Sequence, residues 1–190
     1  MTSWRNTRAQ INAVQSVRHV PTNGVTLSRS VWKAKRRPNE LNTIQYGKAE
    51  LDSRADTCCA GMDFTVIEHT GTTCEVHPYH PKYKPGANVP LVKAVTAYDH
   101  NGNTYILVLN QALYFGDEMP NSLLNPNQIR FNGIIVDDCP THLSPDKAST
   151  HSICFPEQDV RLPIQLHGII SYLNICKPSQ SKIKHANGWN

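Results

Sequence analysis

The chain has 190 residues, of which 39% are hydrophobic and 18% are charged, with 13 prolines and 10 glycines. This length suits one domain with tails. The composition is typical of a loop-rich β protein and disfavours a helical bundle, in which Ala, Leu, Glu and Lys would dominate. No apolar run approaches the roughly 18 residues that a membrane-spanning helix needs, so the sequence predicts no membrane partner.

The net charge of +4 conceals an asymmetry along the chain. Residues 1–48 carry nine Lys or Arg and a single acid, Glu40, whereas residues 49–190 carry ten Lys or Arg and fourteen acids. We therefore expect residues 1–45 to form a basic, disordered arm or linker. Nucleic acid is a candidate partner of this arm through counterion release, and a solvated tail without a partner is the alternative.

The cysteines and the missing export signals predict an intracellular, cytoplasmic protein. Six cysteines lie at irregular spacings, which favours free thiols in a reducing compartment. A mitochondrial presequence is the alternative, because residues 1–39 contain no acid. Pro21 and Gly24 would interrupt the long amphipathic helix of such a presequence.

Short stretches rich in Val, Thr, Tyr and Ile alternate with turn residues from Tyr46 to about Phe115, which predicts a mainly β domain. Residues 64–68 are expected to form a strand that closes at residues 69–71. A further strand begins at residues 74–76 and is interrupted by the segment 77–90, which is rich in Pro, Tyr and His.

Asn101-Gly102 predicts a β-hairpin between the β-prone segments 91–98 and 104–109. Both residues tolerate the positive φ that a tight hairpin turn demands. Tyr98 and Tyr105, which flank the turn, are expected to pack across the strands, although two tyrosines could also stack on bases.

Residues 122–130 depart from the strand pattern and predict one short α-helix. Leu124 and Gln128 fall on one helical face, Asn125 is a suitable N-cap, and Pro126 fits the first turn. Beyond this helix, residues 137–159 are expected to form a polar loop, and residues 160–173 return to β character.

The sequence Leu51-Asp52-Ser53 has the pattern of a carboxylate-dyad hydrolase, with an acid between an apolar strand end and a hydroxyl residue. Two carboxylates at close range share one proton, because like charges there cannot both ionise. One then activates a water molecule while the other polarises a carbonyl group. Since the chain holds one copy of the motif, a complete site requires a homodimer. An Asp-Ser turn without catalytic meaning is the alternative.

Residues 51–57, with the sequence Leu-Asp-Ser-Arg-Ala-Asp-Thr, resemble the Asp-Thr/Ser-Gly-Ala-Asp-Thr loop of retroviral and retrotransposon proteases. Residues 112–115 and 121–129 are similar to the copia-type pattern, in which a Leu-Tyr strand leads to Asn-Leu-Leu-Ser-Val-x-Gln-Leu. The resemblance implies an all-β, retropepsin-like acid-protease barrel over residues 46–136. It also implies that residues 137–190 are a β extension leading towards a pre-integrase region.

The same resemblance implies an aspartic endopeptidase that acts as a homodimer on a retrotransposon polyprotein, without cofactor or metal. It places the substrate-covering flap at residues 76–90 and the family's second motif directly behind the active-site loop. It assigns catalysis to Asp52 and Ser53, and substrate binding to Arg54, Ala55, Asp56, Tyr79 and Tyr83.

Two positions depart from the family pattern. Arg54 replaces the usual glycine, which predicts a strained loop and a positive charge that lowers the pKa of Asp52. Asn125 replaces a second glycine, although Asn tolerates positive φ better than most residues. A catalytically inactive, retrotransposon-derived fragment and a nucleic-acid interaction module are therefore the alternative functions.

The remaining Cys and His residues give weaker signals. Cys139-x2-His142 and His151-x2-Cys154 have ligand types that suit zinc, but their short spacing and polar surroundings weigh against a site. Cys58 and Cys59 follow the Asp52 loop directly and are expected to be buried apolar residues, not nucleophiles.

Overall fold

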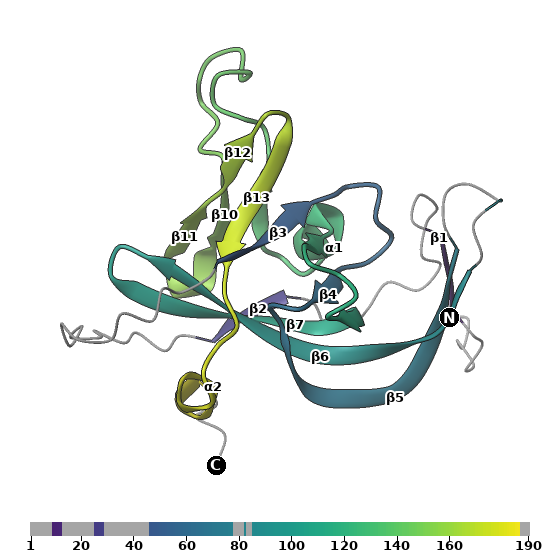
Figure 1. The fold of residues 1–190 in the computed structure, drawn as a ribbon. Helices are drawn as coiled ribbons and strands as arrows, with labels where there is room; N and C mark the ends of the chain where they lie inside the picture. The colour runs from purple at the N-terminus through teal and green to yellow at the C-terminus, as the bar shows by residue number, and fades with distance from the viewer. Residues whose placement is uncertain (1–8, 13–24, 29–45, 78–81, 83–84, 187–190) are drawn as a thin grey trace, which may run out of the picture.

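The computed structural model describes residues 9–12, 25–28, 46–77, 82 and 85–186 (Figure 1). Strands dominate this part of the chain, which confirms the predicted all-β class. The strands are β1 (Ala9–Asn12), β2 (Val25–Ser28), β3 (Gly47–Leu51), β4 (Cys59–Gly61), β5 (Thr65–His77), β6 (Gly86–His100), β7 (Asn103–Gly116), β8 (Ser122–Leu124), β9 (Ile135–Asp137), β10 (Ser152–Phe155), β11 (Val160–Pro163), β12 (Gln165–His167) and β13 (Ile170–Ile175).

The described residues form two short α-helices, α1 (Pro126–Phe131) and α2 (Gln180–Ala186). Helix α1 is the helix that the sequence predicts, with Asn125 as N-cap and a proline in the first turn. Helix α2 corrects the expectation of a single helix. Its sequence gives little signal because Ile183 is its only large apolar residue, and this side chain is buried against β6 and β7 residues.

Ten of the strands form one sheet in the order β1-β5-β6-β7-β4-β8-β3-β13-β12, with β2 paired to β7. Strands β5, β6 and β7 make a long, curved antiparallel meander, visible across the lower half of Figure 1. The pairing path is open at β1 and β12, so the described strands do not close into a barrel.

The β6–β7 hairpin has the predicted turn. Asn101 has a φ of 51° and Gly102 a φ of 77°, the pair of positive values that a two-residue turn of this hand needs. Tyr98 pairs with Tyr105 across the strands, as expected. The Tyr98 hydroxyl donates a hydrogen bond of 2.9 Å to the carbonyl oxygen of Pro163, so this side chain has a structural role.

Strand β5 corrects the predicted break at residues 69–71. It runs without interruption from Thr65 to His77, and its pairing with β6 shifts register between His69 and Thr73. Gly71 has a φ of 76° within this irregular stretch. A glycine in a strand therefore marks a bulge here and not a strand end.

The predicted polar loop at residues 137–159 is also wrong in part. Within it, residues 152–155 form β10, which pairs with β9 and β11 in a separate three-stranded sheet. Ile153 and Phe155 are two positions apart, so they point to the same face of β10, and both are buried. Residues 160–173 form strands as expected.

Strand β3, which leads into the Asp52 loop, lies between two partners. It pairs in parallel with β8 and antiparallel with β13. The main core therefore joins β3, β7, β8 and α1 to the C-terminal strands, through residues such as Ala49, Leu109, Leu124, Ile129 and Leu173.

Within residues 1–45 the structure describes two strands of four residues. Strand β1 pairs in parallel with β5, and β2 pairs antiparallel with β7. The other residues of this segment, on which the prediction of a disordered arm rests, lie outside the described residues.

Candidate active site

Asp52 is the first residue after β3, at the point where the strand leaves the core. Its backbone N–H donates a 3.0 Å hydrogen bond to the carbonyl oxygen of Leu124, the last residue of β8. This bond extends the parallel β3–β8 ladder by one residue. Asp52 itself is half-buried. The strand pair thus fixes the backbone of Asp52 while its side chain stays within reach of solvent.

The Asp52 loop, defined here as residues 52–58, begins with a tight local turn. The backbone N–H of Arg54 donates a 2.8 Å hydrogen bond to Oδ1 of Asp52. Ser53 and Arg54 are exposed. The non-glycine residues with positive φ in the described chain are Asn88, Asn101, Lys147, His151 and Asp159. Arg54 is not among them, so its backbone does not need the glycine that the family has at this position.

The second half of the loop turns inward and becomes buried. Ala55, Thr57 and Cys58 expose at most 6% of their surface, whereas Asp56 is half-buried. A buried loop must satisfy its backbone polar groups within the protein. In this chain the partners come from the N-terminal end of α1.

Asn125 links the helix to the loop. Its side-chain oxygen caps α1 by accepting hydrogen bonds from the backbone N–H groups of Asn127 (2.7 Å) and Gln128 (3.0 Å). Its side-chain nitrogen donates to the carbonyl oxygen of Ala55. Asn125 therefore serves as the helix cap and as a link to the loop. Its φ is −79°, so the tolerance of Asn for positive φ is not needed at this position.

Gln128 makes the second link from α1, with both ends of its amide. Its Oε1 accepts hydrogen bonds from the backbone N–H of Cys58 (2.7 Å) and from Oγ1 of Thr57 (3.1 Å). Its Nε2 donates to the carbonyl oxygen of Gln111 on β7 (3.2 Å). The sequence predicts Gln128 on one helical face with Leu124 and assigns it no role. In the structure Leu124 instead ends β8, and the helix begins at Pro126.

The structure brings most of the predicted site residues together. Asp52, Ser53, Arg54, Ala55 and Asp56 share one loop, and residues 123–128 lie directly behind it, as the resemblance implied. Tyr79 and Tyr83, the predicted flap residues, lie outside the described residues. Strands β5 and β6 lead into and out of that segment.

The two cysteines beside the loop are poor nucleophiles. Burial raises the pKa of both the Cys58 and the Cys59 thiols to about 12, and the charge of Asp52 adds to the shift at Cys59. At neutral pH both thiols are therefore protonated, and a protonated thiol neither attacks carbonyls nor binds metal well. Cys58 is fully buried, as predicted, whereas Cys59 is half-buried.

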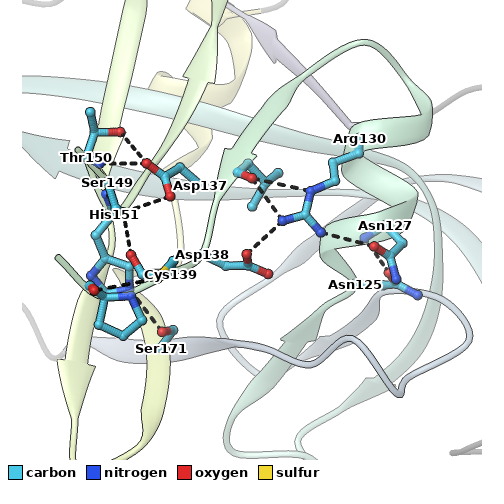
Figure 2. Close-up of polar contacts among 12 residues, drawn as sticks. Asn125, Asn127, Arg130, Asp137, Asp138, Cys139, Ser149, Thr150, His151 and Ser171 are labelled. Carbon is cyan, nitrogen blue, oxygen red and sulfur yellow. Dashed lines mark hydrogen bonds and ion pairs between the residues drawn. The ribbon is translucent and has the colours of Figure 1, made fainter. Parts of the chain in front are cut away.

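A second polar cluster lies on the other side of α1 (Figure 2). Arg130, in the last turn of α1, donates to the carbonyl oxygen of Val136 (2.9 Å) and forms an ion pair with Asp138 (2.7 Å). Its Nη1 also donates to Oδ1 of Asn127 (3.0 Å). These contacts join α1 to β9.

Asp137 and His151 belong to a neighbouring group of polar contacts, which Figure 2 shows beside that of Arg130. Partial burial alone would raise the pKa of Asp137, but hydrogen bonds from Ser149, Thr150 and the backbone of His151 hold it below the usual range. Nε2 of His151 lies 3.0 Å from Oγ of Ser171. Burial lowers the pKa of His151, although Asp137 and Asp138 act in the opposite direction.

Ser171, His151 and Asp137 have the composition of a serine-hydrolase triad but not its geometry. The hydrogen bonds to the Asp137 oxygens come from Ser149, Thr150 and the backbone of His151. A triad instead requires the carboxylate to hold the histidine ring. The cluster is therefore a structural link between β9, β10 and β13. The described residues also contain no group of three or more His, Cys, Asp or Glu that could hold a metal ion.

Comparisons with known proteins find no match for this chain among family models, curated proteins or solved structures. In the described residues, no helix has the length and apolar character needed to cross a membrane. The function of the site must therefore be argued from its own residues.

Proposed function

We propose that this chain is one protomer of a retropepsin-like aspartic endopeptidase of the copia type, with one Asp52 contributed by each of two copies. One observation carries the proposal. The two segments that resemble the family, residues 51–57 and residues 121–129, are far apart in sequence but lie in direct contact. Hydrogen bonds join them from Asp52 to Leu124, from Asn125 to Ala55 and from Thr57 to Gln128.

The position of Asp52 suits acid–base chemistry. Its backbone is held by the β3–β8 ladder, while the side chain is half-buried and accessible. When two copies meet about a two-fold axis, their Asp52 carboxylates share one proton. The ionised carboxylate takes a proton from a water molecule between them, and the protonated one donates a hydrogen bond to the scissile carbonyl. An extended peptide, here a cleavage site in a polyprotein, is the substrate class.

The test is cleavage of a peptide library by the purified protein, with its oligomeric state measured by sedimentation. We expect dimers whose activity is inhibited by pepstatin. Asp52→Asn should lower cleavage by about 10²–10⁴-fold, because the dyad loses its shared proton. Asp117→Asn is the matched control, since Asp117 is an exposed acid in the turn after β7.

Two results would contradict this proposal. Cleavage that survives Asp52→Asn would show that another group performs the chemistry. A dimeric protein without any cleavage would favour the alternative of an inactive, retrotransposon-derived fragment.

A further inference from the structure

We infer that Gln128 is a positioning residue for the Asp52 loop and that its amide sets where the catalytic carboxylate lies. This inference rests on the proposed function and deepens it. The starting observation is burial: Gln128 exposes only 6% of its surface. A buried amide is costly unless its polar atoms are hydrogen-bonded, and those of Gln128 bond to two different elements.

The orientation of this amide is fixed by its partners. Oε1 faces two donors, the Cys58 N–H and the Thr57 hydroxyl, while Nε2 faces an acceptor, the Gln111 carbonyl. If the amide were rotated by 180°, its NH2 group would face the N–H donor of Cys58 and its oxygen would face the carbonyl oxygen of Gln111, so both hydrogen bonds would be lost. Gln128 therefore holds the loop against β7 in one arrangement.

Gln128 anchors Cys58, the last residue of the Asp52 loop. The backbone N–H of Asp52 bonds to Leu124 at one end, and the backbone N–H of Cys58 bonds to Gln128 at the other. The carbonyl oxygen of Cys58 also accepts a 3.0 Å hydrogen bond from the N–H of Leu113 on β7. Without the amide, the Cys58 end would lose its side-chain acceptor. The loop between the two anchors could then shift, and with it the Arg54 N–H that bonds the Asp52 carboxylate.

The consequence for catalysis follows from the geometry of a dyad. Two carboxylates share a proton only when both are placed accurately, and a misplacement of about 1 Å can cost about 10²-fold in rate. We therefore expect Gln128→Met, which keeps the side-chain length but removes the hydrogen bonds, to lower kcat by about 10- to 100-fold. KM should change by less than about threefold, because the buried amide lies beneath the loop and not in contact with substrate.

Gln128→Glu separates positioning from simple packing. A buried carboxyl group has a raised pKa, so in acid it remains protonated and presents one acceptor and one donor, as the amide does. Relative to the parent protein, activity should therefore be near normal at pH 5 and fall to the level of Gln128→Met by pH 7.5. Gln165→Glu makes the same chemical change on an exposed residue of β12 and should follow the parent profile.

Hydrogen exchange of the Cys58 backbone amide, followed by NMR, supplies a measurement that does not depend on activity. Gln128→Met should speed this exchange at least tenfold, while amides in the β6–β7 hairpin keep their parent rates. Unchanged exchange at Cys58 would overturn the inference, as would faster exchange with a normal kcat. An inactive parent protein would instead contradict the proposed function, while the exchange result would still report on the anchor.

If Gln128→Met does not fold, the pH profile of Gln128→Glu decides the question. A profile parallel to that of the parent protein would overturn the inference.

Discussion

Arg54 is the residue at which the Asp52 loop differs most from the family it resembles. Its side chain is exposed, its φ is not positive, and its backbone N–H donates to Asp52. The backbone thus accommodates the arginine without the strain that its position predicted. What remains is a positive charge two residues from Asp52, the residue that the proposed function makes catalytic.

On the proposed function, we expect Arg54→Gly and Arg54→Gln to raise peptide cleavage severalfold, because both remove a positive charge that the family's glycine does not place beside the two carboxylates. Only the glycine variant should be less stable, by about 0.5–1 kcal/mol, since glycine loses more backbone entropy on folding. Cleavage kinetics and urea unfolding of both variants test this expectation. A fall in cleavage with Arg54→Gln would show that the side chain binds substrate, as the resemblance had assigned.

At the scale of single elements, β10 is linked to β13 by His151 and Ser171. His151 is buried, has a φ of 43°, and its pKa is lowered by burial. The folded state therefore binds a proton less readily than the unfolded state, whose histidine has a pKa near 6.5. The contribution of this group to stability is complete above pH 6.5 and is lost as the pH falls towards the lowered folded value.

The expected result is that the free energy of unfolding decreases between pH 7 and pH 5, and that His151→Asn flattens this slope. Asn is chosen because it tolerates the positive φ at this position. Urea denaturation across this pH range is the measurement. Asp137 does not contribute to this slope, because its pKa is lowered from 3.8 and its effect on stability therefore falls at lower pH. An identical slope in both proteins would assign the pH dependence to other groups.

The elements that could be predicted from the sequence are those with local determinants. Asn101-Gly102 forces a turn regardless of its surroundings, and Asn125-Pro126 starts a helix with its own cap. Strand β10 was missed because Ile153 and Phe155 stand in a polar segment whose neighbours β9 and β11 are needed to bury them. The sequence does not predict helix α2, because Ile183 is its single large apolar residue. The packing of Ile183 against β6 and β7 is visible only in the folded structure.

The same limit applied to the site. The family resemblance implied that the Asp52 loop and the residues before and within α1 would meet, and the structure brings them into contact. The hydrogen bonds of Gln128 to Cys58 and Gln111 were not predictable, because they depend on how three separate segments meet. A buried glutamine leaves no mark in a single sequence that separates it from an exposed one.

At the scale of the whole molecule, residues 137–190 are more than an extension of the predicted domain. Strand β13 pairs with β3, and Leu173 and Ile175 are fully buried in the main core. We therefore expect a chain that ends at residue 136 to lack a cooperative unfolding transition, because β3 loses a neighbour and the core loses large side chains.

A chain that ends at residue 179 is the matched control, since it keeps β13 and removes only α2 and the residues after it. It should unfold cooperatively, at a lower urea concentration than the parent protein. Circular dichroism during urea titration compares the three chains. A cooperative transition in the chain ending at residue 136 would restore the domain boundary that the sequence had predicted.

The pairing of β3 with β13 also has a consequence for the order of events during synthesis. Residues 47–51 leave the ribosome long before residues 170–175, yet the two strands lie side by side in the finished fold. Contacts between such distant segments form late and slowly compared with local hairpins. Strand β3, which leads into Asp52, therefore gains its second neighbour only after residue 175 has emerged. On the proposed function, cleavage would therefore begin only after translation has passed residue 175.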